Sequence, residues 1–141
     1  MRVDFYTVGE RFRERPLMLV CKLCAKALDA GLDVQILCVD QAQARAIDEA
    51  LWAFDPECFL PHAMDGEEDA AFAPIRLSIG RAALTPSTPF VLNLTVEPDP
   101  LPRTAARLAE VVLDDDASKL AGRARFRSYR AAGLDPKHHV L

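Results

Sequence analysis

The sequence of 141 residues lacks any long hydrophobic run. No segment approaches the roughly 18 consecutive apolar residues of a membrane-spanning helix. The opening stretch, MRVDFYTVG, carries Asp4 where a secretory signal peptide would be apolar. These absences predict a cytoplasmic protein.

The sequence also lacks the glycine-rich loop that holds nucleotide phosphates. The stretch TVGERFRERP, between the first expected strand and helix, has one glycine and contains neither GxGxxG nor GxxxxGKS/T. The catalytic signatures GxSxG and HExxH are missing, and His62 has no nucleophile beside it in the sequence. We therefore expect a protein that is not an enzyme and binds no cofactor.

Cysteine is scarce, and its spacing does not complete a metal site. Cys21 and Cys24 form a CKLC pair inside a helical pattern, Cys38 lies in an apolar strand, and Cys58 stands alone. Without a second CxxC there is no zinc-finger ligand set. The sequence predicts free thiols, no metal, and burial of the first three cysteines.

Basic charge is limited as well, because the net charge is −4 at pH 7. Binding along a nucleic-acid backbone needs a broad basic surface that displaces counterions. A direct nucleic-acid binder is therefore disfavoured by charge, and a nucleotide-dependent enzyme is disfavoured by the missing glycine loop. Both remain as alternatives.

The apolar residues, 50% of the chain, alternate between strand and helix patterns. Alternating elements of this kind predict a Rossmann-like three-layer α/β/α domain with a mostly parallel sheet, a single domain over residues 1–141. We expect a long surface connection at 55–74. The expected strands are 3–8, 34–39, 75–79, 90–96 and 109–113, and the expected helices before the last are 17–30, 41–54 and 104–108.

One further helix is expected near the end of the chain, after the acidic residues 114–116 and before a capping Gly133. On a helical wheel its two faces differ. One face is basic with an aromatic ring, and is either a solvated surface or a binding surface; the other carries small residues suited to close packing. The first holds Lys119, Arg123, Phe126, Arg127 and Arg130, and the second Ala117, Ala121, Ala124, Ser128 and Ala131.

Three large apolar residues stand away from the expected core. Trp52 points roughly 130° from the apolar stripe of helix 41–54, in which Asp40 and Gln43 have capping-box spacing. Phe59 and Leu60 lie between prolines, where they either fold onto the body of the protein or meet a partner. Tryptophan is enriched where partners bind, so Trp52 is a candidate interface residue.

Two stretches, IDEALWAFDPECFLPH at 47–62 and KLAGRARFRSYRAAG at 119–133, resemble the chi subunit of bacterial DNA polymerase III. The resemblance extends over nearly the whole chain. It implies a non-catalytic accessory protein that links the clamp loader to single-stranded-DNA-binding protein. Such subunits bind the acidic carboxyl-terminal tail of that protein, which ends in an aromatic residue with a free carboxylate, and they separately bind the small psi subunit.

The resemblance places tail binding on Trp52, Lys119, Arg123 and Phe126. It implies that Arg123 grips the terminal carboxylate, that Lys119 screens the other charges of the tail, and that Trp52 and Phe126 enclose the terminal ring. The family commonly has tyrosine where Phe126 stands, and the segment after Val112 is shorter than usual. Val112 is our candidate for the strand residue that closes the pocket.

The same resemblance assigns Phe59 and Leu60 to the region that faces psi or a competing partner. Some bacteria with a chi-like protein have no recognisable psi. The psi subunit is therefore expected as a partner only where the source organism has one.

Overall fold

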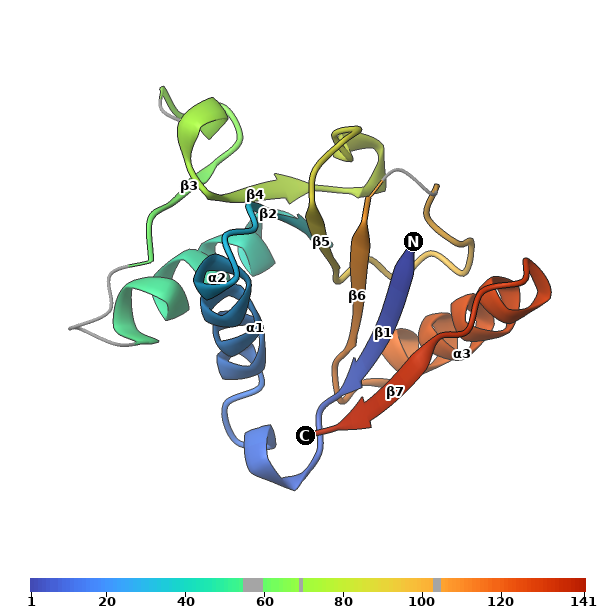
Figure 1. Ribbon diagram of the computed structural model, residues 1–141. Coiled ribbons are helices and arrows are strands. Elements are labelled where there is room, and N and C mark those ends of the chain that lie inside the picture. Colours follow the sequence, from blue (N-terminus) through green and yellow to red (C-terminus); the bar gives the residue numbers. More distant parts are fainter. Residues whose placement is uncertain (55–59, 69, 103–104) are drawn as a thin grey trace.

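A seven-stranded parallel sheet forms the centre of the computed structural model (Figure 1), which describes residues 1–54, 60–68, 70–102 and 105–141. Its strand order is β3-β4-β2-β5-β6-β1-β7. The strands are β1 (Arg2–Thr7), β2 (Val34–Cys38), β3 (His62–Met64), β4 (Ile75–Ile79), β5 (Phe90–Asn93), β6 (Arg107–Val112) and β7 (Lys137–Val140).

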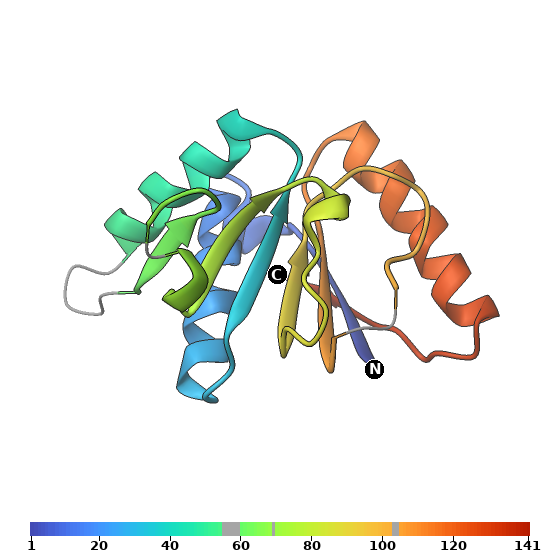
Figure 2. The same ribbon diagram turned by 90° about the horizontal axis from the view of Figure 1, so that it is seen from above.

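The helices lie on both faces of this sheet, as Figure 2 shows. They are α1 (Leu17–Asp29), α2 (Gln41–Phe54) and α3 (Asp116–Ala131), with short 3-10 turns η1 (Glu10–Phe12), η2 (Ala70–Phe72) and η3 (Arg81–Ala83). Strand β2 supplies both faces, because Ile36 belongs to the core cluster that contains residues of α1 and α2, while Leu37 belongs to the cluster that contains Tyr129 of α3. The expected α/β fold with a parallel sheet is confirmed.

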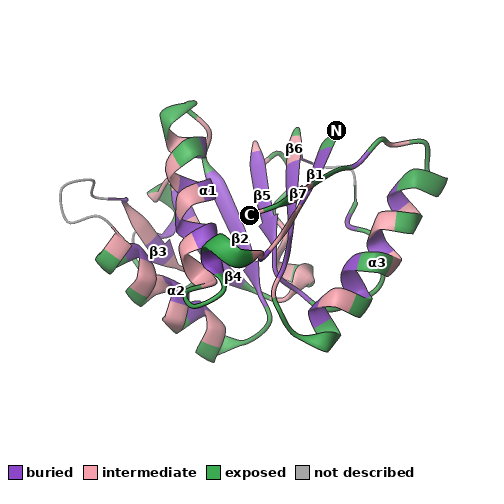
Figure 3. Ribbon diagram, turned by 90° about the horizontal axis from the view of Figure 1, so that it is seen from below, coloured by how far each residue is buried: buried purple, intermediate pink, exposed green. Residues whose placement is uncertain are grey.

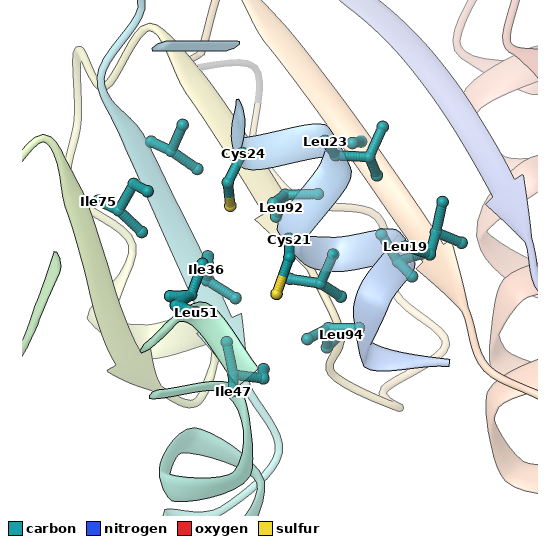
Figure 4. Close-up of a cluster of buried hydrophobic side chains, with 14 of the residues drawn as sticks. Leu19, Cys21, Leu23, Cys24, Ile36, Ile47, Leu51, Ile75, Leu92 and Leu94 are labelled. Atoms are coloured by element: carbon teal, nitrogen blue, oxygen red, sulfur yellow. The ribbon is translucent and has the colours of Figure 1, made fainter. Parts of the chain in front are cut away.

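The cysteines of α1 and β2 belong to the larger core cluster. Cys21, Cys24 and Cys38 are buried and free, and Figure 4 shows the first two among leucine and isoleucine side chains. Burial raises the pKa of Cys21 to about 11 and that of Cys38 to about 12. The predicted burial is confirmed, and Cys58 lies outside the described residues.

Helix α2 has the predicted bounds, but one hydrogen bond of its amino-terminal cap differs from the predicted capping box. The Gln43 amide donates to Asp40 Oδ1 at 2.8 Å, as a capping box requires. The Gln43 side chain, however, accepts from the amide of Val39 at 2.7 Å and not from that of Asp40. The cap therefore also ties down the end of β2.

The structure differs from the sequence-based predictions at several places along the chain. The expected connection 55–74 contains β3 and η2, and β7 was not expected at all. The expected helix 104–108 is wrong over its described part, because Arg107 and Leu108 begin β6. Strand β5 ends at Asn93 and does not reach Val96.

Local hydrogen bonding accounts for the early end of β5. The Asn93 side chain accepts from the backbone amide of Thr95 at 3.1 Å and from its hydroxyl at 2.6 Å. An asparagine that bonds to the backbone two residues on turns the chain. The sequence does not indicate strands β3 and β7, because each is short and has little apolar alternation. Within the described ranges no helix is long and apolar enough to cross a membrane.

Candidate functional site

Helix α3 begins and ends where its sequence signals predict. The Asp115 side chain accepts from the backbone amide of Ser118 at 2.8 Å, which satisfies an amide of the first turn. Gly133 has φ +87°, the left-handed conformation that glycine adopts without steric cost after a helix. The predicted helix is confirmed.

The face that α3 buries differs from the predicted one. Figure 3 shows a buried stripe along the helix, and it consists of Ser118, Ala121, Gly122, Arg125 and Tyr129. Of the small residues expected to pack, only Ala121 is buried, while Ala117 and Ala131 are exposed. The prediction of a small-residue packing face is therefore wrong, because two large polar side chains take that place.

Those side chains surround Glu110, a fully buried carboxylate in β6. Arg125 Nε lies 3.0 Å from Glu110 Oε2, and the Tyr129 hydroxyl donates to the same oxygen at 2.9 Å. Asn93 donates to Oε1 at 2.7 Å. Burial raises the pKa of Glu110, whereas the Arg125 charge and these donors lower it. With a guanidinium and two neutral groups directed at it, the carboxylate is held in place by its partners.

The same network reaches the loop that follows β5. Arg125 donates from a terminal guanidinium nitrogen to the carbonyl of Glu97 at 2.6 Å. The amide of Leu101 donates to the Tyr129 hydroxyl at 2.9 Å. Helix α3 is therefore attached to both β6 and the loop by buried polar contacts, which set its position over the sheet.

Next to this anchored helix lies a cavity of about 470 Å³. The strands contribute Phe5 and Thr7 of β1, Val112 of β6 and His138 of β7. Thr7 and Val112 are the last residues of their strands, so the cavity opens near the carboxyl edge of a parallel sheet, where ligands commonly bind. Helix α3 contributes Lys119, Gly122, Arg123, Phe126 and Arg127.

Gly122 lets α3 approach β6 closely at this cavity. A Cβ atom on Gly122 would lie 2.8 Å from Val112 Cγ2, well inside a normal contact. Sequence reasoning passed over this glycine, although an isolated glycine within a helical pattern indicates close packing or function. Gly122 and Val112 both line the cavity at this point of close approach.

The apolar part of the cavity is built around two rings. Phe126, half-buried on α3, meets Phe5 of β1 edge to face, with ring centroids 5.1 Å apart. Phe5 also contacts the Tyr129 ring at 6.1 Å. The buried network behind Tyr129 thus supports the ring stack that lines the cavity.

The charged part of the cavity comes from one edge of α3. Lys119 is paired with Asp114 at 2.8 Å, and this hydrogen bond raises the pKa of Lys119 and lowers that of Asp114. Arg123 and Arg127 are exposed and form no ion pair with any carboxylate in the described part of the chain. The cavity therefore presents two guanidinium groups beside an apolar lining.

Four of the residues expected at the site line this one cavity, and Trp52 does not. Val112, Lys119, Arg123 and Phe126 are brought together, whereas Trp52 lies on α2, 59% exposed. Its ring packs against His62 of β3, at the opposite edge of the sheet from β7. The expectation that Trp52 and Phe126 enclose one slot is wrong, because a helical wheel does not reveal which part of the sheet a helix covers.

The region around Trp52 forms a separate surface, beneath which the His62 side chain is buried. His62 Nδ1 is 2.7 Å from the Leu60 carbonyl oxygen, and Nε2 is 2.8 Å from Asp48 Oδ1. Leu60 is 7% exposed and packs in the core, so its side chain folds onto the body of the protein. Phe59 lies outside the described residues.

Comparison with known proteins gives one consistent family. Residues 1–137 match the family model described as DNA polymerase III chi subunit, HolC. The DNA polymerase III subunit chi of Pseudomonas aeruginosa is 36% identical over 140 residues, which cover 99% of this chain and 96% of that protein. The subunit of Haemophilus influenzae is 32% identical over 131 residues (92% and 90%), and that of Escherichia coli is 30% identical over 117 residues (83% and 80%).

Proposed function

Because this chain belongs to the DNA polymerase III chi subunit family, we propose that it is a non-catalytic accessory subunit in DNA replication that binds the acidic carboxyl-terminal tail of single-stranded-DNA-binding protein. In this role it links that protein to the clamp loader in the cytoplasm. The tail docks in the cavity between α3 and strands β6, β1 and β7.

The observation that carries this proposal is the pairing of charge and apolar lining in one cavity. Arg123 and Arg127 stand beside the Phe5–Phe126 ring pair and Val112, with no carboxylate of the described chain neutralising either arginine. A tail that ends in an aromatic residue offers a ring for the apolar lining and a carboxylate for the guanidinium groups. Arginine binds a carboxylate through two parallel hydrogen bonds, which suits a chain terminus.

Within the cavity, Arg123 holds the terminal carboxylate. It lies in the middle of the lining segment of α3, between Lys119 at one end and Arg127 at the other. Arg127 is at the edge, where an exposed charge affects association rate and salt dependence more than affinity. Lys119 already has a partner in Asp114 and acts on the tail at longer range.

The test is a calorimetric titration of a synthetic tail peptide into wild type, Arg123→Ala and Arg127→Ala. We expect Arg123→Ala to lose about tenfold or more in affinity, as for removal of a charge-assisted hydrogen bond, and Arg127→Ala to lose less. Trp52→Ala is the matched control, because Trp52 lies far from the cavity, and it should bind within about twofold of wild type. Circular dichroism checks that each variant is folded.

Two results would count against the proposal. If Arg123→Ala binds as tightly as wild type, or Arg127→Ala is the weaker of the two, the terminal carboxylate does not sit at Arg123. If wild type does not bind the peptide and instead binds bare oligonucleotide with an affinity that falls steeply with salt concentration, the chain is a direct nucleic-acid binder.

We place the psi subunit, where the source organism has one, on the surface around Trp52. The exposed Trp52 ring packs on His62, only two residues after Leu60 in the segment that the family resemblance assigns to psi. Phe59 remains part of this proposal, and Leu60 contributes as buried support. A pull-down of psi should fail with Trp52→Ala and persist with Arg123→Ala; the reverse pattern would move psi to the cavity.

A further inference from the structure

The strands that line the cavity contribute a histidine, His138 of β7. In the strand order β6-β1-β7, the lining residues Val112, Thr7 and His138 lie on three adjacent strands. Neighbouring strands are about 4.8 Å apart, so β7 is roughly 10 Å from β6, the strand on which α3 packs. The cationic residues of α3 and the imidazole of His138 therefore line the cavity from two different elements.

The ring of His138 is held so that one nitrogen remains for a ligand. Its Nε2 lies 2.7 Å from Thr7 Oγ1. When the threonine hydroxyl donates to Nε2, the neutral ring carries its proton on Nδ1. Nδ1 has no hydrogen-bond partner among the residues that the structure describes. In that tautomer the exposed ring presents an N–H donor to the cavity.

The next residue, His139, is engaged elsewhere. Its Nε2 is 3.0 Å from Asp4 Oδ1, and its ring stacks on Tyr6 at 4.9 Å. Successive residues of a strand point to opposite faces of the sheet, which is why only His138 lines the cavity. The pair offers a matched comparison of a histidine in the site with a histidine outside it.

We propose that His138 is a further peptide-binding residue of this cavity, whose imidazole donates a hydrogen bond to an acidic side chain of the ligand while Arg123 holds its terminal carboxylate. The inference rests on the proposed function. Arg123 and His138 line the same cavity from different elements, α3 and β7, so one bound peptide can meet them with two different carboxylates. An extended peptide advances about 3.3 Å per residue, so an acidic side chain a few residues before the terminus reaches the β7 side. The ligand class is therefore a carboxyl-terminal peptide with a second carboxylate upstream.

The experiment compares three peptides: the tail peptide, the same peptide with a terminal carboxamide, and the same peptide with its acidic side chains replaced by amides. Each is titrated into wild type, His138→Ala, Arg123→Ala and His139→Ala. For the unmodified peptide, His138→Ala should weaken binding about three- to tenfold, and His139→Ala should not. The His138→Ala loss should disappear with the amide side chains and persist with the carboxamide terminus, while Arg123→Ala should show the opposite pattern.

Several results would overturn this assignment. One is a His138→Ala protein that is folded and binds all three peptides like wild type. Another is a loss that depends on the terminal carboxylate and not on the side chains. Should His138→Ala not fold, His138→Gln, which keeps a polar side chain of similar length, takes its place with the same expected pattern. If wild type binds none of the peptides, the proposed function itself fails, which is distinct from wild-type binding with an unaffected His138 variant.

Discussion

Replacing Arg125 by methionine should lower the free energy of unfolding of this protein far more than the same change at Arg127. Both arginines lie on α3 and are separated by a single residue. Arg125 is 1% exposed and its Nε is 3.0 Å from Glu110 Oε2, whereas Arg127 is exposed at the cavity. Methionine fills much of the same volume in either position. The difference between the two variants therefore reports the buried charge.

The magnitude follows from what Arg125→Met leaves behind. Glu110 stays fully buried without its cation, and the Glu97 carbonyl loses its guanidinium donor. Breaking a buried ion pair from one side costs about 3–5 kcal/mol. An exposed substitution such as Arg127→Met costs about 0.5 kcal/mol or less. For a chain of this size, the buried change should lower Tm by roughly 6 to 20 °C.

The free energy of unfolding that Arg125→Met costs should be smaller at acidic pH. Burial raises the pKa of Glu110, and Arg125 lowers it, so removing Arg125 raises that pKa further. Protonation then removes the uncompensated charge from the folded state. Because a raised carboxyl pKa in the folded state costs stability above that pKa, the free energy lost by Arg125→Met should be largest at neutral pH and smaller towards pH 5.

Urea unfolding followed by circular dichroism, at pH 7.5 and pH 5.5, measures the free energy of unfolding of wild type, Arg125→Met and Arg127→Met. Adding Glu110→Gln to Arg125→Met should restore part of the lost free energy, because the neutral amide no longer needs a cation. The reasoning is refuted if Arg125→Met is no less stable than Arg127→Met at pH 7.5. It is also refuted if adding Glu110→Gln to Arg125→Met lowers the free energy of unfolding further.

Three further predictions follow from local geometry. Gly122→Ala adds a methyl group 2.8 Å from Val112 Cγ2, and this overpacking, about 1–3 kcal/mol, should outweigh the gain of about 1 kcal/mol in helix propensity; a higher Tm would contradict it. Asp115→Ala removes the cap of α3 and should cost about 1 kcal/mol in urea unfolding, with Asp115→Asn near wild type. Burial raises the pKa of Cys21 to about 11 and of Cys38 to about 12, so iodoacetamide at pH 8 should label these two thiols only after unfolding. Mass spectrometry that finds either thiol labelled in briefly treated folded protein would contradict this prediction.

Local patterns in the sequence determined much of the fold and one side of the candidate site. The 3.6-residue repeat, the capping residues Asp40 and Gly133 and the acidic residues 114–116 predicted α2 and α3 correctly, since helix ends depend on neighbours within a turn. The wheel of α3 likewise placed Lys119 and Arg123 on one exposed edge. These features involve interactions within a few residues, which a sequence displays directly.

Tertiary structure alone decided which distant residues share a surface. Arg125 carries a charge, and a charged residue type indicates exposure to solvent, yet it is buried because Glu110 lies opposite it on β6. Trp52 is separated from Phe126 because α2 packs beside β3 and α3 beside β6, at different parts of the sheet. His138 joins the cavity only through the pairing of β7 with β1. Each outcome depends on strand order and on contacts between residues far apart in the chain, which local patterns do not encode.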